Sequence, residues 1–96
     1  MILALESSCD ETAAAVIDPP RTLLSSEVAS QVNKHRPFGG VVPELASRNH
    51  LLSLRPVIES ALKGAGTPLT KMDAFAATSG PGLASSLLMG LSLIHI

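Results

Sequence analysis

Apolar runs separated by polar turns dominate the first third of the chain. Three β-strands are predicted, at residues 2–7, 12–17 and 22–30. The turn at residues 18–21 contains two prolines, which fix φ and remove backbone donors. We therefore expect the third strand to run antiparallel to the second. Residues 30–40 have mixed polarity and end in Gly-Gly, which is typical of a loop.

The pattern becomes helical in the middle of the chain. Apolar residues recur there at steps of three and four, as one stripe on a helix face requires. That stripe consists of Leu51, Leu54, Ile58, Ala61, Leu62 and Ala65. Pro43 suits a first helical turn, and the predicted helix ends near Lys63, before Gly64 and Gly66. Pro56 lies inside the pattern and predicts a kink or a split into two helices.

A further strand and helix complete the pattern. Residues 74–78 are apolar on both faces and predict a short central strand. A Ser-Gly-Pro-Gly turn follows, and a second helix is expected to begin near Leu83. The order β-β-β-α-β-α indicates the α/β class, with a mixed sheet and helices on its faces. It resembles the beginning of one lobe of the actin-like, ribonuclease H-like ATPase fold.

Length and composition narrow the class of protein. The 96 residues make one small domain or part of a larger one, and 46% hydrophobic residues favour a packed chain over a disordered one. A net charge of -1 offers no broad basic surface for nucleic acid. The single Cys excludes an internal disulfide. We recognise no signal peptide, and the apolar stretch at residues 83–96 is too short to span a bilayer, so we expect a cytoplasmic protein.

The segment Ser-Ser-Cys-Asp-Glu-Thr at residues 7–12 carries the strongest chemical signal. A turn between two hairpin strands can aim successive N–H groups at one anion, and three hydroxyl side chains add donors. Asp10 and Glu11 repel a bare phosphate. They can instead hold a cation that bridges to phosphate, or accept a proton from an attacking amine. The plainer alternative is a polar turn whose acids are solvated.

The Cys and His residues give weaker signals. Cys9 could act as a nucleophile only with a base at hydrogen-bond distance, for which His35 and His50 are candidates. No spacing favours either His, and a small Cys packed in the turn is the alternative. The three His residues, with His95 as the third, show neither HxxxH nor HExxH spacing. We therefore expect no metal site formed by this chain alone.

Two other segments could border a functional site. Residues 78–83, Thr-Ser-Gly-Pro-Gly-Leu, form a strand–turn–helix unit that could bring backbone amides and a helix N-terminus to an anion. The unit lacks the GxGxxG pattern and the P-loop Lys, and a tight structural turn fits equally well. Glu44 and Arg48 lie four residues apart at the start of the predicted helix. They can form a solvated ion pair, or they can belong to a functional rim or partner contact.

Three segments together resemble one known family. ESSCDETAAAV, GGVVPELASRNH and ATSGPGLASSLLMGLS stand in the order and approximate spacing of segments of the tRNA N6-adenosine threonylcarbamoyltransferase family. This family was formerly called O-sialoglycoprotein endopeptidase or glycoprotease. The SSCDET form is similar to the bacterial and mitochondrial branch, and the resemblance runs from Ile2 to about Ser92.

The resemblance implies a two-lobed, actin-like enzyme with its active site between the lobes. Such an enzyme transfers threonylcarbamoyl from threonylcarbamoyl-adenylate to N6 of the adenosine beside the tRNA anticodon. Implied partners are tRNA, an inactive paralogous subunit that packs against the N-terminal lobe, and a small ATPase, with no membrane. The implied cofactor is one iron or zinc ion.

Matched to the family motifs, Asp10 and Glu11 are implied to orient or deprotonate the adenosine amine, or to hold the water shell of the metal. The resemblance assigns further residues to the substrate and nucleotide cleft: Ser8, Cys9, Thr12, Ser79, Gly80, Pro81 and Gly82. Glu44 and Arg48 would belong to the partner face or the cleft rim.

The resemblance also has limits. The family holds its metal with two His of an HxxxH motif and a distant Asp, all expected beyond residue 96. Residues 1–92 are expected to form the N-terminal part of the first lobe, with the second lobe absent. Residues 93–96 do not continue the family's helix, and we interpret them as a non-native or truncated tail. The chain alone is therefore expected to be inactive.

Two alternative functions remain at this stage. An actin-like sugar or acetate kinase also opens with an acidic turn, but it would need a second phosphate loop downstream. A non-catalytic paralogous partner subunit is the other alternative. The paired acids in the turn argue against it, because a scaffold has no use for them there.

Overall fold

The computed structural model describes residues 1–31 and 35–94 and has the predicted order of strands and helices. The elements are β1 (Ile2–Glu6), β2 (Glu11–Asp18), β3 (Thr22–Ser30), α2 (Pro43–Ala65), β4 (Ala74–Ala77) and α3 (Ala84–Ile94). Two short 3-10 turns, η1 (Arg36–Phe38) and η2 (Leu69–Lys71), lie in the connections. Residues 32–34 of the expected loop, and His95 and Ile96 of the expected tail, lie outside the described residues. The interpretation of residues 93–96 stays a prediction.

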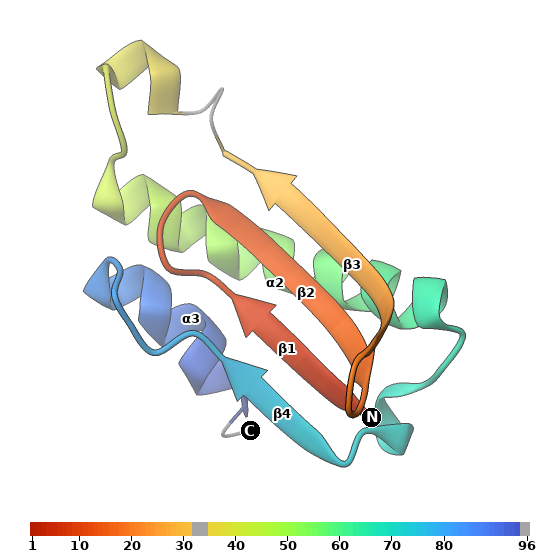
Figure 1. Cartoon of the computed structure of the whole chain (residues 1–96). Coiled ribbons are helices and arrows are strands. Elements are labelled where there is room, and N and C mark those ends of the chain that lie inside the picture. Colours follow the sequence, from red (N-terminus) through yellow and green to blue (C-terminus); the bar gives the residue numbers. More distant parts are fainter. Residues whose placement is uncertain (32–34, 95–96) are drawn as a thin grey trace.

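The four strands form one mixed sheet in the order β3-β2-β1-β4 (Figure 1). The pairs β1–β2 and β2–β3 are antiparallel, as predicted for the second and third strands, and β4 runs parallel to β1. A central fourth strand was predicted, whereas within the described residues β4 pairs only with β1 and most of its residues are exposed. An apolar sequence shows that a strand tolerates burial, but it does not set the number of neighbouring strands.

One face of the sheet forms the core with helix α2. Side chains alternate along β1 and β2, so that every second residue points towards the helices. The core cluster consists of Leu3, Leu5, Ala14, Val16, Val57 and Ala61. Burying a side chain such as Leu or Val contributes about 1.5–3 kcal/mol, so this cluster is the main support of the fold.

Helix α2 continues through Pro56 as one helix, so the predicted split into two helices is wrong. Pro56 cannot donate to the carbonyl of Leu52, four residues earlier. Leu52 is 70% exposed, however, and water can satisfy this carbonyl without breaking the helix. The predicted stripe is buried at Leu54 and Ala61, whereas Leu51 is 66% exposed.

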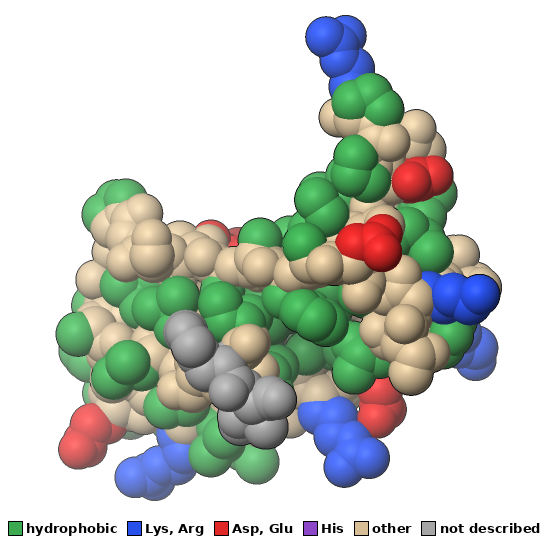
Figure 2. Space-filling view, turned by 90° about the horizontal axis from the view of Figure 1, so that it is seen from below, with side chains coloured by type: hydrophobic (Ala, Val, Ile, Leu, Met, Phe, Trp, Pro, Cys, Tyr) green, Lys and Arg blue, Asp and Glu red, His purple; other side chains and the backbone are tan. Residues whose placement is uncertain are grey.

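An apolar groove of about 640 Å³ lies between α2 and α3. Residues from both helices and from the sheet line it, including Leu54, Ile58, Phe75 and Met89. Figure 2 looks at the end of the molecule where the groove opens and shows hydrophobic side chains gathered there. None of residues 6–12 or 78–82 lines this groove, so it is distinct from the segments that carry the chemical signals. Within the described residues, no helix is long and apolar enough to cross a bilayer.

Candidate functional site: an acidic turn and a Gly-Pro-Gly turn in contact

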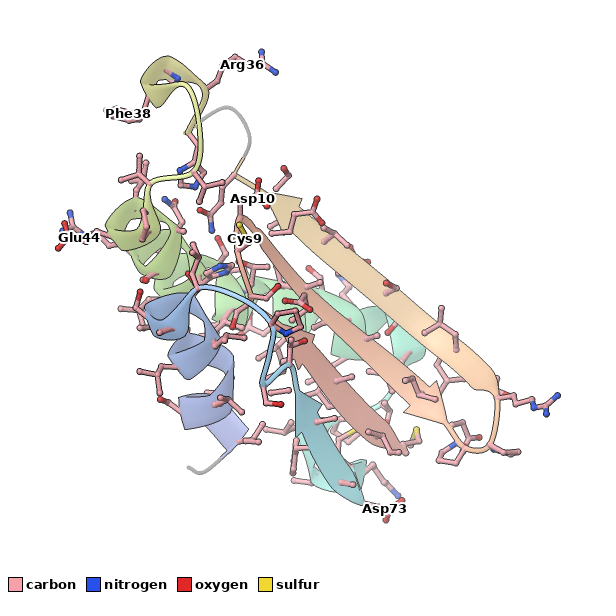
Figure 3. The ribbon with its side chains drawn as sticks, turned by 60° about the vertical axis from the view of Figure 1, so that its left-hand side comes forward. Cys9, Asp10, Arg36, Phe38, Glu44 and Asp73 are labelled. Atoms are coloured by element: carbon pink, nitrogen blue, oxygen red, sulfur yellow. The ribbon has the colours of Figure 1, made fainter. Side chains whose placement is uncertain are left out.

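Residues 7–12, here called the acidic turn, comprise the connection from β1 to β2 and the first two residues of β2, at one end of the sheet. Figure 3 shows Cys9 and Asp10 at this end, beside the start of α2 and the η1 turn, whereas Asp73 marks the opposite end. The first residue of the turn, Ser7, is buried. Its hydroxyl donates to the Ser86 carbonyl oxygen at 2.7 Å and accepts from the Gly90 N–H at 3.1 Å. This hydroxyl thus ties the turn to α3 and is engaged within the protein.

The acidic turn contacts the Gly-Pro-Gly turn that precedes α3. The Leu83 N–H donates to the Ser8 carbonyl oxygen at 2.8 Å. Gly82 lies so close to Ser8 that a Cβ atom at position 82 would come within 2.7 Å of the same oxygen. Two segments about 70 residues apart in the sequence therefore form one continuous surface, and only Gly fits at their contact.

Glu6 connects the same two turns and was missed in the sequence. Its carboxylate accepts from the Ser8 N–H at 2.5 Å and from the Thr78 hydroxyl at 2.6 Å. Burial alone would raise the pKa of Glu6, but the hydrogen bonds from Ser8 and Thr78, with His50 nearby, outweigh burial and lower this pKa. The available signal was an ionisable residue at the end of an otherwise apolar strand.

His50 holds the acidic turn from the side of α2. It is fully buried, with Nε2 2.8 Å from the Cys9 carbonyl oxygen and Nδ1 2.7 Å from the Thr12 hydroxyl. The sequence suggested His50 only as a base for the Cys9 thiol, whereas the ring bonds the backbone of Cys9. Burial, together with the charge of Asp10, raises the pKa of the Cys9 thiol. This disfavours the thiolate that a nucleophile needs and favours the packed alternative.

The two acids of the turn differ in their surroundings. Asp10 is half-buried, and its carbonyl oxygen accepts from the Gln31 N–H at 2.8 Å. It also lines a small cavity of about 320 Å³ whose other wall is the segment from His35 to Val41. Glu11 is the first residue of β2 and is exposed. The wall from His35 to Val41 was predicted only as a loop, and no local pattern in it indicated a position beside Asp10.

Glu44 and Arg48 lie on the exposed side of α2. In Figure 3 the side chain of Glu44 points away from Asp10 and into solvent. The ion pairs of the described residues join the Met1 amino group to Asp73 at 2.6 Å and Arg55 to Glu59 at 2.9 Å, and none joins Glu44 to Arg48. Both residues remain available for a partner or rim contact.

No group of three or more His, Cys, Asp or Glu side chains within residues 1–31 and 35–94 could hold a metal ion. The acids at the site are Glu6, Asp10 and Glu11. Glu6 is engaged by Ser8 and Thr78, which leaves Asp10 and Glu11 as the carboxylates that a substrate could meet.

Comparisons with known proteins show which family and which fold the chain resembles. A family model described as tRNA N6-adenosine threonylcarbamoyltransferase matches residues 22–95. Proteins of that name from Geobacter sp. (strain M21) and Symbiobacterium thermophilum are each 59% identical to this chain, over 97% and 96% of its length. The solved structure "YeaZ from Pseudomonas aeruginosa" is 26% identical over 97% of this chain and 36% of its own, with a TM-score of 0.68.

The likeness to YeaZ confirms the predicted actin-like, ribonuclease H-like fold. The chain spans about a quarter of the length of the curated relatives it matches, since the aligned region covers 27% of each of the two relatives named above. From the sequence identity and the family match, the chain belongs to the tRNA N6-adenosine threonylcarbamoyltransferase family.

Proposed function

We propose that this chain is part of the catalytic lobe of a tRNA N6-adenosine threonylcarbamoyltransferase. Family membership supports the reaction class. The contact of Ser8 with Gly82 and Leu83 carries the structural argument, because it joins the acidic turn to the Gly-Pro-Gly turn in one surface. On such a surface, the carboxylates that an attacking amine could meet lie beside backbone groups of the Gly-Pro-Gly turn, which could border a nucleotide.

In the proposed reaction, the N6 amine of adenosine attacks the carbamoyl carbon of threonylcarbamoyl-adenylate. A C–N bond forms, the C–O bond to the phosphate breaks, and AMP leaves. The amine loses one proton in this step, and Asp10 or Glu11 accepts it or orients the amine for attack. Their different exposure suits different roles, with Asp10 beside the cavity and Glu11 open to an approaching tRNA.

The residues around the acids shape the site. Cys9 and Thr12 hold the turn through their bonds to His50, and Ser8 holds it against the Gly-Pro-Gly turn. We propose that residues 79–82 border the adenylate. The exposed pair Glu44 and Arg48 would lie at the cleft rim or meet the inactive paralogous subunit.

The remaining components would come from outside this chain. The iron or zinc ion implied by the resemblance would be bound by residues beyond residue 96, where it would supply positive charge to the adenylate. The small ATPase would act on the assembled complex. We propose no ligand for the ion among residues 1–31 and 35–94.

A graft enzyme tests the proposal. Residues 1–92 of this chain replace the aligned segment of the Geobacter relative, which is feasible because the two are 59% identical. Transfer is measured as modified adenosine in tRNA supplied with threonylcarbamoyl-adenylate and the relative's own partner proteins. We expect activity within about tenfold of the parent, and none from the 96-residue chain alone. A well-folded graft enzyme without activity would argue against the proposed function.

The alternatives give different results in the same preparation. An actin-like kinase lobe would support ATP-dependent phosphorylation of a small sugar or acetate rather than modification of tRNA. A non-catalytic subunit would leave the graft enzyme inactive but would bind an intact relative. The two readouts, phosphorylated product and complex formation, separate these alternatives from the transferase.

A further inference from the structure

His50 contacts the acidic turn on both sides of the acid pair. Its Nε2 lies 2.8 Å from the carbonyl oxygen of Cys9, directly before Asp10, and its Nδ1 lies 2.7 Å from the hydroxyl of Thr12, directly after Glu11. One buried ring therefore fixes the two ends of the dipeptide that carries the carboxylates.

The bonding roles follow from the chemistry of the two partners. A carbonyl oxygen only accepts, so Nε2 of His50 donates to Cys9. In the neutral ring Nδ1 then accepts from the hydroxyl of Thr12. Both ring nitrogens are engaged and the ring is fully buried, so His50 is not exposed for proton exchange with a substrate. Its position suits holding the turn rather than chemistry of its own.

The helix that carries His50 is itself anchored beside the site. Ser47, one turn earlier on α2, donates to the Pro43 carbonyl oxygen at 3.0 Å and lies 2.6 Å from the hydroxyl of Ser85 on α3. Further along α2, Leu54, Val57 and Ala61 are buried, and two of them belong to the core cluster. His50 thus connects a rigid, packed helix to a turn whose second acid is exposed.

We propose that His50 is a positioning residue that sets the place of Asp10 and Glu11 through its bonds to Cys9 and Thr12. The inference rests on the proposed function for its effect on catalysis. Its structural part, that His50 fixes the turn, stands on the hydrogen bonds alone.

Two substitutions separate the two bonds. The amide of His50→Gln reaches the place of Nε2 and can keep the bond to Cys9, whereas the amide of His50→Asn reaches only the place of Nδ1 and can keep the bond to Thr12. Thr12→Val and Thr12→Ser form a second pair, in which only Ser retains the hydroxyl. Leu52→Ala is the control, since Leu52 is on the same helix and 70% exposed.

The structural part is tested in the 96-residue chain by amide hydrogen exchange. The Gln31 N–H bonds the Asp10 carbonyl oxygen and reports on the position of the turn. We expect its exchange to become at least tenfold faster in His50→Gln and His50→Asn, with the amides at the centre of β1 and β2 unchanged. Unchanged protection of Gln31 in both variants would overturn the proposal, whatever the graft enzyme does.

The catalytic part is tested in the graft enzyme. We expect kcat per folded enzyme to fall about tenfold or more in both His50 variants, with KM for threonylcarbamoyl-adenylate within about twofold. Thr12→Ser should recover most of what Thr12→Val loses, and this pair carries the test if the His50 variants fold poorly. If His50 only filled space in the core, its substitution would lower the folded fraction and leave kcat of the folded enzyme intact.

A double-mutant cycle distinguishes positioning from an independent effect. If His50 acts through the acids, the loss in His50→Gln shrinks in an Asp10→Asn or a Glu11→Gln background. If His50→Gln lost as much activity in the acid variants as in the unsubstituted graft enzyme, the proposal would be overturned. An inactive unsubstituted graft enzyme would count against the proposed function, and the exchange measurement would then decide the structural part alone.

Discussion

Gly82 lies against the backbone of Ser8, and this contact joins the two turns of the candidate site. A Cβ atom at position 82 would come within 2.7 Å of the Ser8 carbonyl oxygen and 2.8 Å of the Ser8 Cβ. The Leu83 N–H donates to that same oxygen at 2.8 Å, so the backbone of Ser8 has little freedom to withdraw. The absence of a side chain at position 82 is therefore a condition for the geometry of the site.

Gly82→Ala should destabilise the protein, because the added methyl forces the two turns apart. We expect a loss of about 1–3 kcal/mol in the free energy of unfolding, as for other overpacked sites, measured by urea denaturation of the 96-residue chain. Gly40→Ala is the control, since a Cβ atom there would meet nothing within 4 Å. Equal stability of the two variants would mean that the turns can separate at no cost.

The Cys9 thiol should react slowly with alkylating reagents. Burial and the charge of Asp10 raise its pKa, which lowers the thiolate fraction near neutral pH. We expect iodoacetamide at pH 7.5 to modify Cys9 more slowly in the folded chain than in urea, and Asp10→Asn to increase the folded rate. A folded rate equal to the rate in urea would contradict the raised pKa.

Glu6 should make the stability of the chain depend on acid pH. Its pKa is lowered in the folded state, so its stabilising contribution is present above the unfolded pKa and is lost as pH falls through the folded pKa. We expect Glu6→Gln to cost about 1 kcal/mol near pH 6, a modest value for hydrogen bonds to a partly exposed carboxylate, and less at pH 3. Urea denaturation at the two pH values measures the difference.

Glu27→Gln is the control for Glu6. Glu27 is also a Glu on a strand, but it is exposed on β3. If the two substitutions gave the same change in stability at pH 6 and pH 3, the bonds of Glu6 to Ser8 and Thr78 would carry no specific energy.

Much of the fold could be predicted because local patterns determine it. Alternation and turn chemistry defined β1 to β3, and the spacing of three and four residues defined α2. The parallel pairing of β4 with β1 could not be predicted, since neighbours in a sheet are chosen by tertiary packing. The persistence of α2 through Pro56 could not be predicted either, because it depends on the exposure of the helix at Leu52, whose carbonyl has no N–H donor at Pro56.

The sequence indicated the two segments of the site but not the contact between them. The motifs at residues 7–12 and 78–83 could be found in the sequence, but the contact between Ser8 and Gly82 needed the parallel pairing of β1 with β4, which aligns the ends of these strands. Glu6 was missed and His50 misassigned because each bonds a segment distant in the sequence, Glu6 through the Thr78 hydroxyl and His50 through the Cys9 carbonyl oxygen and the Thr12 hydroxyl. No spacing rule along the chain reports such contacts.

Glu11→Gln in the graft enzyme should abolish most activity while leaving the fold intact. Glu11 is exposed at the first position of β2, so the amide should cost little stability, and the substitution removes the carboxylate of Glu11 that could accept a proton. General-base residues contribute about 10²–10⁴-fold, and we expect a loss in this range in kcat for tRNA modification. Circular dichroism and the unfolding midpoint establish that the variant is folded. Glu27→Gln serves as the matched control, because it neutralises an exposed acid on the neighbouring strand without approaching the turn. Normal levels of modified tRNA in the Glu11 variant would remove Glu11 from the mechanism and leave Asp10, beside its cavity, as the acid to be tested next.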